Sequence, residues 1–159
     1  MMTLTMGMRC SEVVRCVVRD LDNGGRELWI GESKTAAGRR RLGVPDFLQP
    51  YLKELTRSKL PTAPIFTTAK SQGGPPDRAW PRKWVKRICK ASGVMRVCAH
   101  SMRGLFSTLG LELGITPQAV AATLGHEKQR TTLEHYAQPG AAEVAPRARA
   151  LATLLSDQP

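Results

Sequence analysis

Residues 100–126 read HSMRGLFSTLGLELGITPQAVAATLGH, and much of the fold prediction starts from this stretch. Proline is favoured at the first position of a helix, so Thr116-Pro117 marks a helix start. Glycine ends helices readily because it adopts a left-handed backbone, and Gly114 and Gly125 are placed to do so. The stretch predicts two successive helices, over residues 100–114 and 116–124.

Helical patterns continue on both sides of this pair. Residues 80–92 place Trp84, Val85 and Ile88 on a predicted inward face and basic residues on the outward face. Toward the C-terminus, two further helices are predicted, over residues 131–136 and 143–156. Most of this half of the chain is therefore expected to be helical.

The N-terminal half mixes helix and strand signals. The first six residues read as the last turn of a helix closed by Gly7, and Ser11 opens the amphipathic stretch SEVVRCVVRDL. The runs ELWIGES and RRRLGVP resemble strands, and the small residues 35–38 join them into a predicted hairpin. A third predicted helix opens at Asp46 and carries Phe47, Leu48, Tyr51, Leu52 and Leu55 on one side. Residues 59–79 predict an exposed loop with a brief strand.

Composition bounds the class of protein. The 159 residues suit one domain, and 42% hydrophobic residues are too many for a disordered basic tail. We predict an α+β fold, a mainly α-helical domain with a small antiparallel β-sheet. The 24 Lys and Arg outnumber 13 Asp and Glu, which leaves a net charge of +11. Such a surplus favours nucleic acid as partner, with an anionic membrane surface as the second candidate.

The cysteines and the hydropathy pattern exclude other classes. The four cysteines form no C-x-x-C pair, which does not fit a disulfide-rich secreted protein or a zinc ribbon. No stretch approaches the roughly 20 apolar residues that span a bilayer. We therefore expect a cytoplasmic protein without a membrane partner.

Six polar side chains stand out as candidates for chemistry. His100 and Arg103 are three residues apart, so on a helix they share one face near its start, where an anion is favoured. His126 follows Gly125 at a helix end, and Tyr136 is one of only two tyrosines. Arg9 precedes a helix with Glu12 able to pair with it, and Lys34 ends the first hairpin strand. Taken singly, each has an ordinary structural explanation.

Together these side chains match what metal-free cleavage of a phosphodiester requires. Two guanidinium groups can clamp the negative charge that develops on the phosphate oxygens. A tyrosine can supply the attacking oxygen, and a lysine can return a proton to the departing sugar oxygen. No metal or cofactor is needed, and we expect none.

The order of the motifs resembles the tyrosine recombinase (phage integrase) family. GMRCSE, KTAAGRRRLGVP, HSMRGLFST, TLGH and TTLEHYA follow one another as in the family's C-terminal catalytic domain. The resemblance implies that Arg9 and Arg103 hold the scissile phosphate and that Lys34 is the general acid. It also implies that His100 transfers protons, that His126 bonds the phosphate, and that Tyr136 forms a 3′-phosphotyrosyl bond.

Further expectations follow from the resemblance. The family rejoins DNA strands without ATP, on double-stranded DNA and in dimeric or tetrameric assemblies, so association with the nucleoid is expected. Residues 1–159 would be one catalytic domain lacking the family's N-terminal DNA-binding domain and first helices. Residues 139–159 would form a tail helix that packs in cis or in trans. The residues expected to contact DNA phosphates are Arg39, Arg40, Arg41, Arg82, Lys83, Lys86, Arg87 and Lys90.

Three alternatives remain open at this point. The chain could be an inactive DNA-binding domain of the same fold, because a loosely assembled site does not catalyse. A metal site would use Cys98, His100, His126 and His135, at spacings that fit no common ligand pattern. An RNA-binding domain is permitted by the charge, although three Phe and two Tyr provide few stacking platforms.

Overall fold

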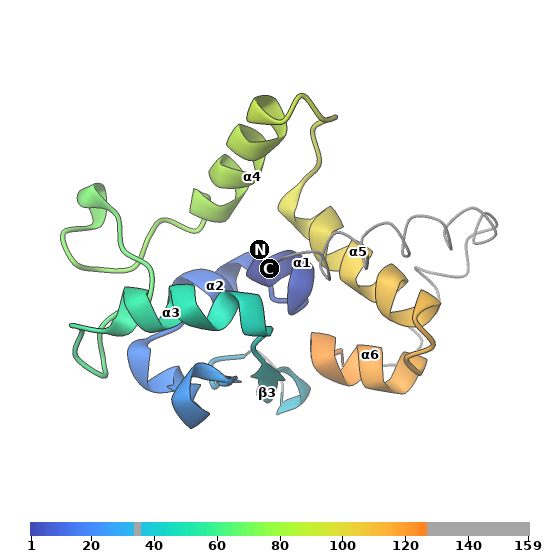
Figure 1. Ribbon diagram of the computed structural model, residues 1–159, viewed down its shortest axis with the longest axis horizontal. Helices are drawn as coiled ribbons and strands as arrows, with labels where there is room; N and C mark the ends of the chain where they lie inside the picture. Colours follow the sequence, from blue (N-terminus) through green and yellow to red (C-terminus); the bar gives the residue numbers. More distant parts are fainter. Residues whose placement is uncertain (34–35, 127–159) are drawn as a thin grey trace.

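The computed structural model describes residues 1–33 and 36–126, and these confirm the α+β prediction. The helices are α1 (Met2–Thr5), α2 (Cys10–Arg15), α3 (Gln49–Thr56), α4 (Trp80–Ala91), α5 (Ala99–Glu112) and α6 (Pro117–Leu124). Short 3-10 turns are η1 (Val18–Asp20), η2 (Asn23–Gly25), η3 (Ala36–Gly38), η4 (Asp46–Leu48) and η5 (Ala69–Ser71). In Figure 1, α4 projects from the body, and α5 descends from its far end to α6.

A three-stranded antiparallel sheet with strand order β1-β2-β3 supports the N-terminal half. Its strands are β1 (Leu21–Asp22), β2 (Glu27–Ile30) and β3 (Arg40–Gly43). The register pairs Leu28 with Leu42 and Ile30 with Arg40, and all four of these residues are buried. The predicted hairpin is confirmed as β2 and β3, whereas the two-residue strand β1 was not predicted.

The main core lies between this sheet, α1 and α3. Met8, Leu28 and Ile65 are fully buried at its centre. Ile65 donates its N–H to the carbonyl of Cys16 at 2.9 Å, which ties the loop over residues 59–79 to the body. A second, smaller cluster joins α2, α4 and α5 around Val85, Cys89 and Ala99.

Three details of the helix predictions are corrected. The helix from Ser11 was expected to reach Val18, but α2 ends at Arg15, and Val17 instead forms a β-bridge with Pro64. β-branched residues suit such an extended backbone. On α3, Tyr51 and Leu55 are exposed, and only the strip with Leu52 faces the core.

The inward face of α4 is narrower than predicted. Pro81, Val85 and Cys89 are buried, whereas Trp84 is 45% exposed and Ile88 is 50% exposed. Trp84 instead stands edge-on to Trp80, with 6.3 Å between ring centroids. The cause is that α4 projects from the body and packs on α2 and α5 along one strip only (Figure 1).

Candidate active site

Arg9 is fixed where α2 begins. Its backbone N–H donates to Glu12 Oε2 and its Nη1 donates to Glu12 Oε1, both at 2.8 Å. The expected pairing of Glu12 with Arg9 is thus confirmed. These two bonds form a capping arrangement that satisfies an end group of the helix and holds the arginine in one place.

Glu12 is buried and bonds a second arginine. Arg40 Nη1 donates to Glu12 Oε1 at 3.1 Å, and Arg40 Nη2 donates to Oε2 at 3.0 Å. Burial by itself raises the pKa of the Glu12 carboxyl, but the hydrogen bonds and charges of Arg40 and Arg9 outweigh burial and lower that pKa below its usual value. Glu12 therefore remains a carboxylate and can anchor both arginines.

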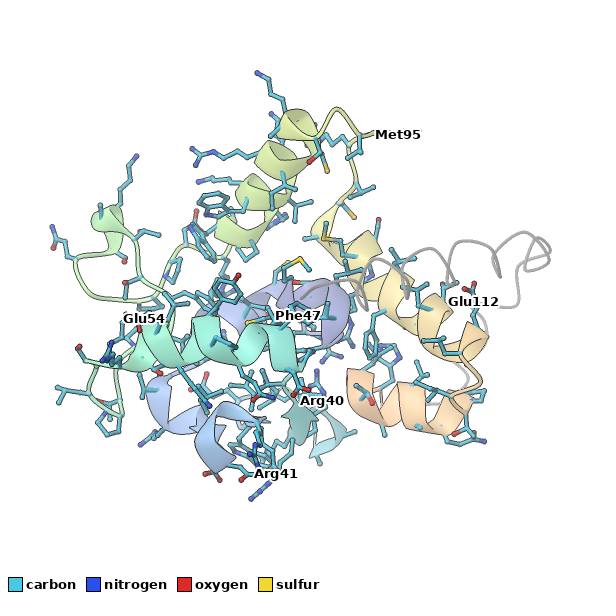
Figure 2. All side chains as sticks on the ribbon, in the orientation of Figure 1. Arg40, Arg41, Phe47, Glu54, Met95 and Glu112 are labelled. Atoms are coloured by element: carbon cyan, nitrogen blue, oxygen red, sulfur yellow. The ribbon has the colours of Figure 1, made fainter. Side chains whose placement is uncertain are left out.

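Arg40 corrects one expectation of the sequence analysis. It was placed among the residues facing DNA, but it is 8% exposed and donates to Glu12 and to the carbonyls of Gly38 and Thr123. Alternation along β3 turns Arg40 to the same side as Leu42 and turns Arg41 outward. Figure 2 shows Arg40 beside β3, whereas Arg41 extends at the lower edge of the molecule. The period of two in RRRLGV was the signal that could have revealed this.

Arg103 lies on the buried side of α5, 4% exposed. Its two terminal nitrogens donate to the carbonyls of Gly7 and Leu124. Arg9 Nη2 reaches the neighbouring carbonyl of Gly125 at 3.3 Å. The two arginines, from α2 and α5, are therefore both held at the same turn, Leu124-Gly125-His126. The carbonyl partners orient the Arg103 guanidinium without neutralising its charge, whereas Arg9 is also paired with the Glu12 carboxylate.

The turn after α6 requires a glycine. Gly125 has a left-handed backbone with φ of +65°, and a Cβ added there would lie 3.0 Å from Ala37 O, Gly38 Cα and Arg40 Nη1. The hairpin connection η3 thus packs directly on this turn. His126 follows, half-buried, with its N–H donating to Ala121 O at 3.0 Å.

A pocket of about 380 Å³ collects several of the candidate residues. Arg9, His100 and Arg103 all line it, from the start of α2 and the first two turns of α5. His100 is exposed and Arg103 is buried, so the histidine lies toward solvent and the arginine on the protein side. Such a pocket is suited to an anion.

Two more arginines line the same pocket. Arg82, on the first turn of α4, was expected to contact DNA, whereas Arg78 was not identified from the sequence. Arg78 precedes α4 in a stretch that was predicted only as an exposed loop. Because Arg78 lies outside α4, helical spacing does not link it to Arg82, and only the folded structure brings the two to one pocket.

The other expected DNA-contacting residues are exposed. Arg39 and Arg41 belong to the hairpin, and α4 presents Lys83, Lys86, Arg87 and Lys90. Lys83 pairs with Asp77 at 3.5 Å, and Arg87 stacks over Trp84 at 5.5 Å.

Several expectations fall outside the described residues. These are Lys34, Tyr136, the alternative metal ligand His135 and the tail helix over residues 139–159. Among residues 1–33 and 36–126, no three His, Cys, Asp or Glu side chains gather as a metal site. No helix in that same part of the chain is long and apolar enough to span a bilayer.

Cys98 caps the helix that carries His100 and Arg103. Its sulfur accepts the Ser101 N–H at 3.2 Å and lies 2.9 Å from Ser101 Oγ. The hydrogen bond with the Ser101 side chain and then that with its backbone lower the pKa of the exposed Cys98 thiol. In contrast, burial raises the pKa of Cys16 to about 12.

These features define an α+β domain in which two arginines and a histidine line one pocket that is suited to an anion. The model of the phage integrase family matches residues 1–143, and the chain belongs to that family. No curated protein sequence matches the chain significantly.

Solved structures of recombinases share the fold. The Tn1549 transposon integrase in complex with a circular-intermediate DNA is 19% identical with a TM-score of 0.72, over 96% of this chain and 56% of that one. XerA recombinase is 16% identical with a TM-score of 0.74, over 99% and 57%. XerH recombinase bound to its difH substrate is 25% identical with a TM-score of 0.67, over 91% and 42%. This chain therefore spans little more than half the length of the first two of these proteins.

Proposed function

We propose that this chain is the catalytic domain of a site-specific DNA recombinase that cleaves and rejoins strands through a covalent 3′-phosphotyrosyl intermediate. The observation that carries the proposal is the lining of one pocket by Arg9, His100 and Arg103, which are separated by up to 94 positions in the sequence. Membership of the phage integrase family supports it. The DNA complexes of similar folds make double-stranded DNA the expected partner.

In the proposed reaction the oxygen of Tyr136 attacks the phosphorus of one phosphodiester. The bond from phosphorus to the tyrosyl oxygen forms as the bond to the 5′ oxygen breaks, and Lys34 gives that oxygen a proton. His100 transfers the proton at the tyrosine, and His126 bonds the phosphate. Arg9 and Arg103 stabilise the charge on the other two phosphate oxygens. The energy of the broken bond stays in the new ester, so rejoining requires no ATP.

Arg103 is well placed for its proposed role. The carbonyls of Gly7 and Leu124 accept from its two terminal nitrogens and hold the planar guanidinium in one orientation. The fork is thereby oriented before substrate arrives, which is the condition for electrostatic stabilisation of a transition state.

Covalent capture tests the proposal. The protein is incubated in EDTA with a pool of nicked duplexes, and adducts that survive denaturant are sought. We expect an adduct with the wild type and none with Tyr136→Phe. Tyr51→Phe is the matched control, because Tyr51 is the other of the two tyrosines and is 69% exposed on α3.

The outcomes separate catalysis from binding alone. Wild-type protein that binds the duplexes but forms no adduct with any of them would favour the inactive DNA-binding domain. An adduct that survives in Tyr136→Phe would show that another residue is the nucleophile. Self-association on DNA is a further expectation, tested by the mass of the wild-type complex in solution.

A further inference from the structure

The pocket holds more positive charge than one phosphodiester needs. A scissile linkage carries a single negative charge, and the proposed clamp of Arg9 and Arg103 already provides two guanidinium groups for it. Arg78 and Arg82 line the same pocket as two additional cations. At about 380 Å³, the pocket is also larger than one phosphorus with its four oxygens.

Arg78 and Arg82 differ from Arg9 and Arg103 in their interactions with the rest of the protein. Arg9 bonds Glu12 and Gly125, and Arg103 bonds two carbonyls. In the part of the chain that the structure describes, Arg78 and Arg82 form no ion pair within 4 Å. The nearest acidic residue in sequence, Asp77, instead accepts from Ala79 N–H at 3.1 Å and from Lys83 Nζ at 3.5 Å.

Both side chains are also exposed, so their charges remain accessible to a ligand. Arg82 lies on the first turn of α4 and Arg78 just before that helix, whereas Arg9 lies just before α2 and Arg103 lies on α5. Since α4 packs on both helices, three separate segments of the chain bring the four arginines to one pocket. Two separate pairs of guanidinium groups at one pocket are suited to two neighbouring anions rather than to one.

We propose that Arg78 and Arg82 form a second phosphate subsite, which binds the phosphodiester next to the cleaved one on the same strand. The inference rests on the proposed function for its ligand, a DNA backbone. The subsite would fix the strand at two successive linkages, so that the phosphorus held by Arg9 and Arg103 is presented in one register. Arg78 and Arg82 are thus positioning residues, since neither is assigned to the reacting phosphate.

Short oligonucleotides test the subsite without knowledge of the target sequence. The dithymidine d(TpT) has one phosphodiester and the trithymidine d(TpTpT) has two, and binding of each is measured by NMR titration at low salt. We expect the wild type to bind d(TpTpT) about tenfold more tightly than d(TpT), the size of one charge-assisted hydrogen bond. Arg78→Ala and Arg82→Ala should lose most of this gain.

The matched control is Arg26→Ala, which removes one positive charge from an exposed residue outside the pocket and outside the expected DNA contacts. A third ligand, d(TpTpT) with one linkage replaced by a neutral methylphosphonate, should bind the wild type as weakly as d(TpT) does. A gain that persists in Arg82→Ala, or that falls equally in Arg26→Ala, would overturn the inference. This binding experiment requires no cleavage. If the wild type forms no covalent adduct through Tyr136, only the catalytic proposal is contradicted, and the oligonucleotide result still tests the subsite.

Discussion

Glu12 is a single buried carboxylate on which two arginines depend. Arg9 is held toward the pocket and Arg40 is held inside the fold, both by the same pair of oxygens. Removing one partner of a buried ion pair costs far more than the pair itself contributes, because the remaining charge is left buried. The effect of losing Glu12 is therefore expected to be large and to depend on pH.

We predict that Glu12→Gln lowers the free energy of unfolding by about 3 kcal/mol at pH 7. The pKa of Glu12 is lowered by folding, so its contribution is complete above the unfolded pKa, about 4.3, and is lost as pH falls through the folded pKa. The difference between wild type and variant should therefore narrow below about pH 4.3, as measured by chemical denaturation.

The control for this prediction is Glu54→Gln, whose pair with Arg57 is exposed on α3. It should change stability little at any pH, because exposed ion pairs contribute little. The assignment of the Glu12 carboxylate as the anchor would be contradicted if the difference in free energy of unfolding between wild type and Glu12→Gln stayed constant from pH 7 to pH 3.

At the scale of elements, the end of α6 brings the site together. Gly125 allows α6 to stop where its last carbonyls meet Arg9 and Arg103, and it leaves room for the hairpin connection η3. Gly125 is thus required both for its left-handed backbone and for the lack of a side chain beside η3. A glycine at another helix end that has the same backbone but open space around it separates the two effects.

We predict that Gly125→Ala is more destabilising than Gly93→Ala. Gly93 follows α4 with the same φ of +65°, but nothing lies within 4 Å of a Cβ there. Gly93→Ala should cost about 1 kcal/mol, the price of a left-handed alanine. Gly125→Ala should cost roughly 1–3 kcal/mol more, because backbone atoms of Ala37 and Gly38 cannot move aside easily. If thermal or chemical unfolding showed the same loss of stability for both variants, the packing of η3 against this turn would be loose.

The hydrogen bonds at the start of α5 lead to a prediction about the reactivity of the Cys98 thiol. Because the hydrogen bonds from Ser101 lower the pKa of Cys98, more of this exposed thiol is thiolate at pH 7 than of an ordinary cysteine. Iodoacetamide followed by mass spectrometry should modify Cys98 before Cys10 and Cys89, with Cys16 last.

Ser101→Ala should slow the alkylation of Cys98, because it removes the side-chain hydrogen bond that contributes most to lowering the thiol pKa. Ser92→Ala, at the end of α4, is the control and should leave the rate unchanged. If Cys10 reacted first, the hydrogen bonds at the start of α5 would not govern thiol reactivity.

At the scale of the whole molecule, which carries a net charge of +11, the projecting helix α4 carries five basic residues and no acidic one. If DNA is the partner, each phosphate contact releases counterions, and the logarithm of the affinity falls with the logarithm of the salt concentration by about 0.9 per contact. We predict that replacing Lys83, Lys86, Arg87 and Lys90 by alanine lowers this slope by about 3.6.

The control variant removes the same charge elsewhere, at the exposed residues Arg19, Arg26, Lys53 and Arg57. It should leave the slope nearly unchanged when binding to a duplex is measured by fluorescence anisotropy across salt concentrations. A similar decrease in both variants would mean that the surface attracts DNA without a preferred track along α4.

The helices, the hairpin and the pairing of Arg9 with Glu12 were predictable because their signals are local. Pro117 and Gly125 act through their own backbones, and Glu12 lies one helical turn from Arg9. The limits of α2 and the exposure of Trp84 were not predictable in this way. Each depends on what packs alongside: Pro64 opposite Val17, and open solvent beside the projecting helix.

The amino-acid order by itself determined the class of fold, the positions of most elements and the family, since these follow from short-range spacing and motif order. Only the tertiary structure decided that Arg40 serves Glu12 inside the protein and that Arg78 and Arg82 share a pocket with Arg9 and Arg103. The physical reason is that charge alone does not tell a solvated arginine from one with buried partners. Those partners lie on segments that are distant in sequence and meet only when the chain has folded.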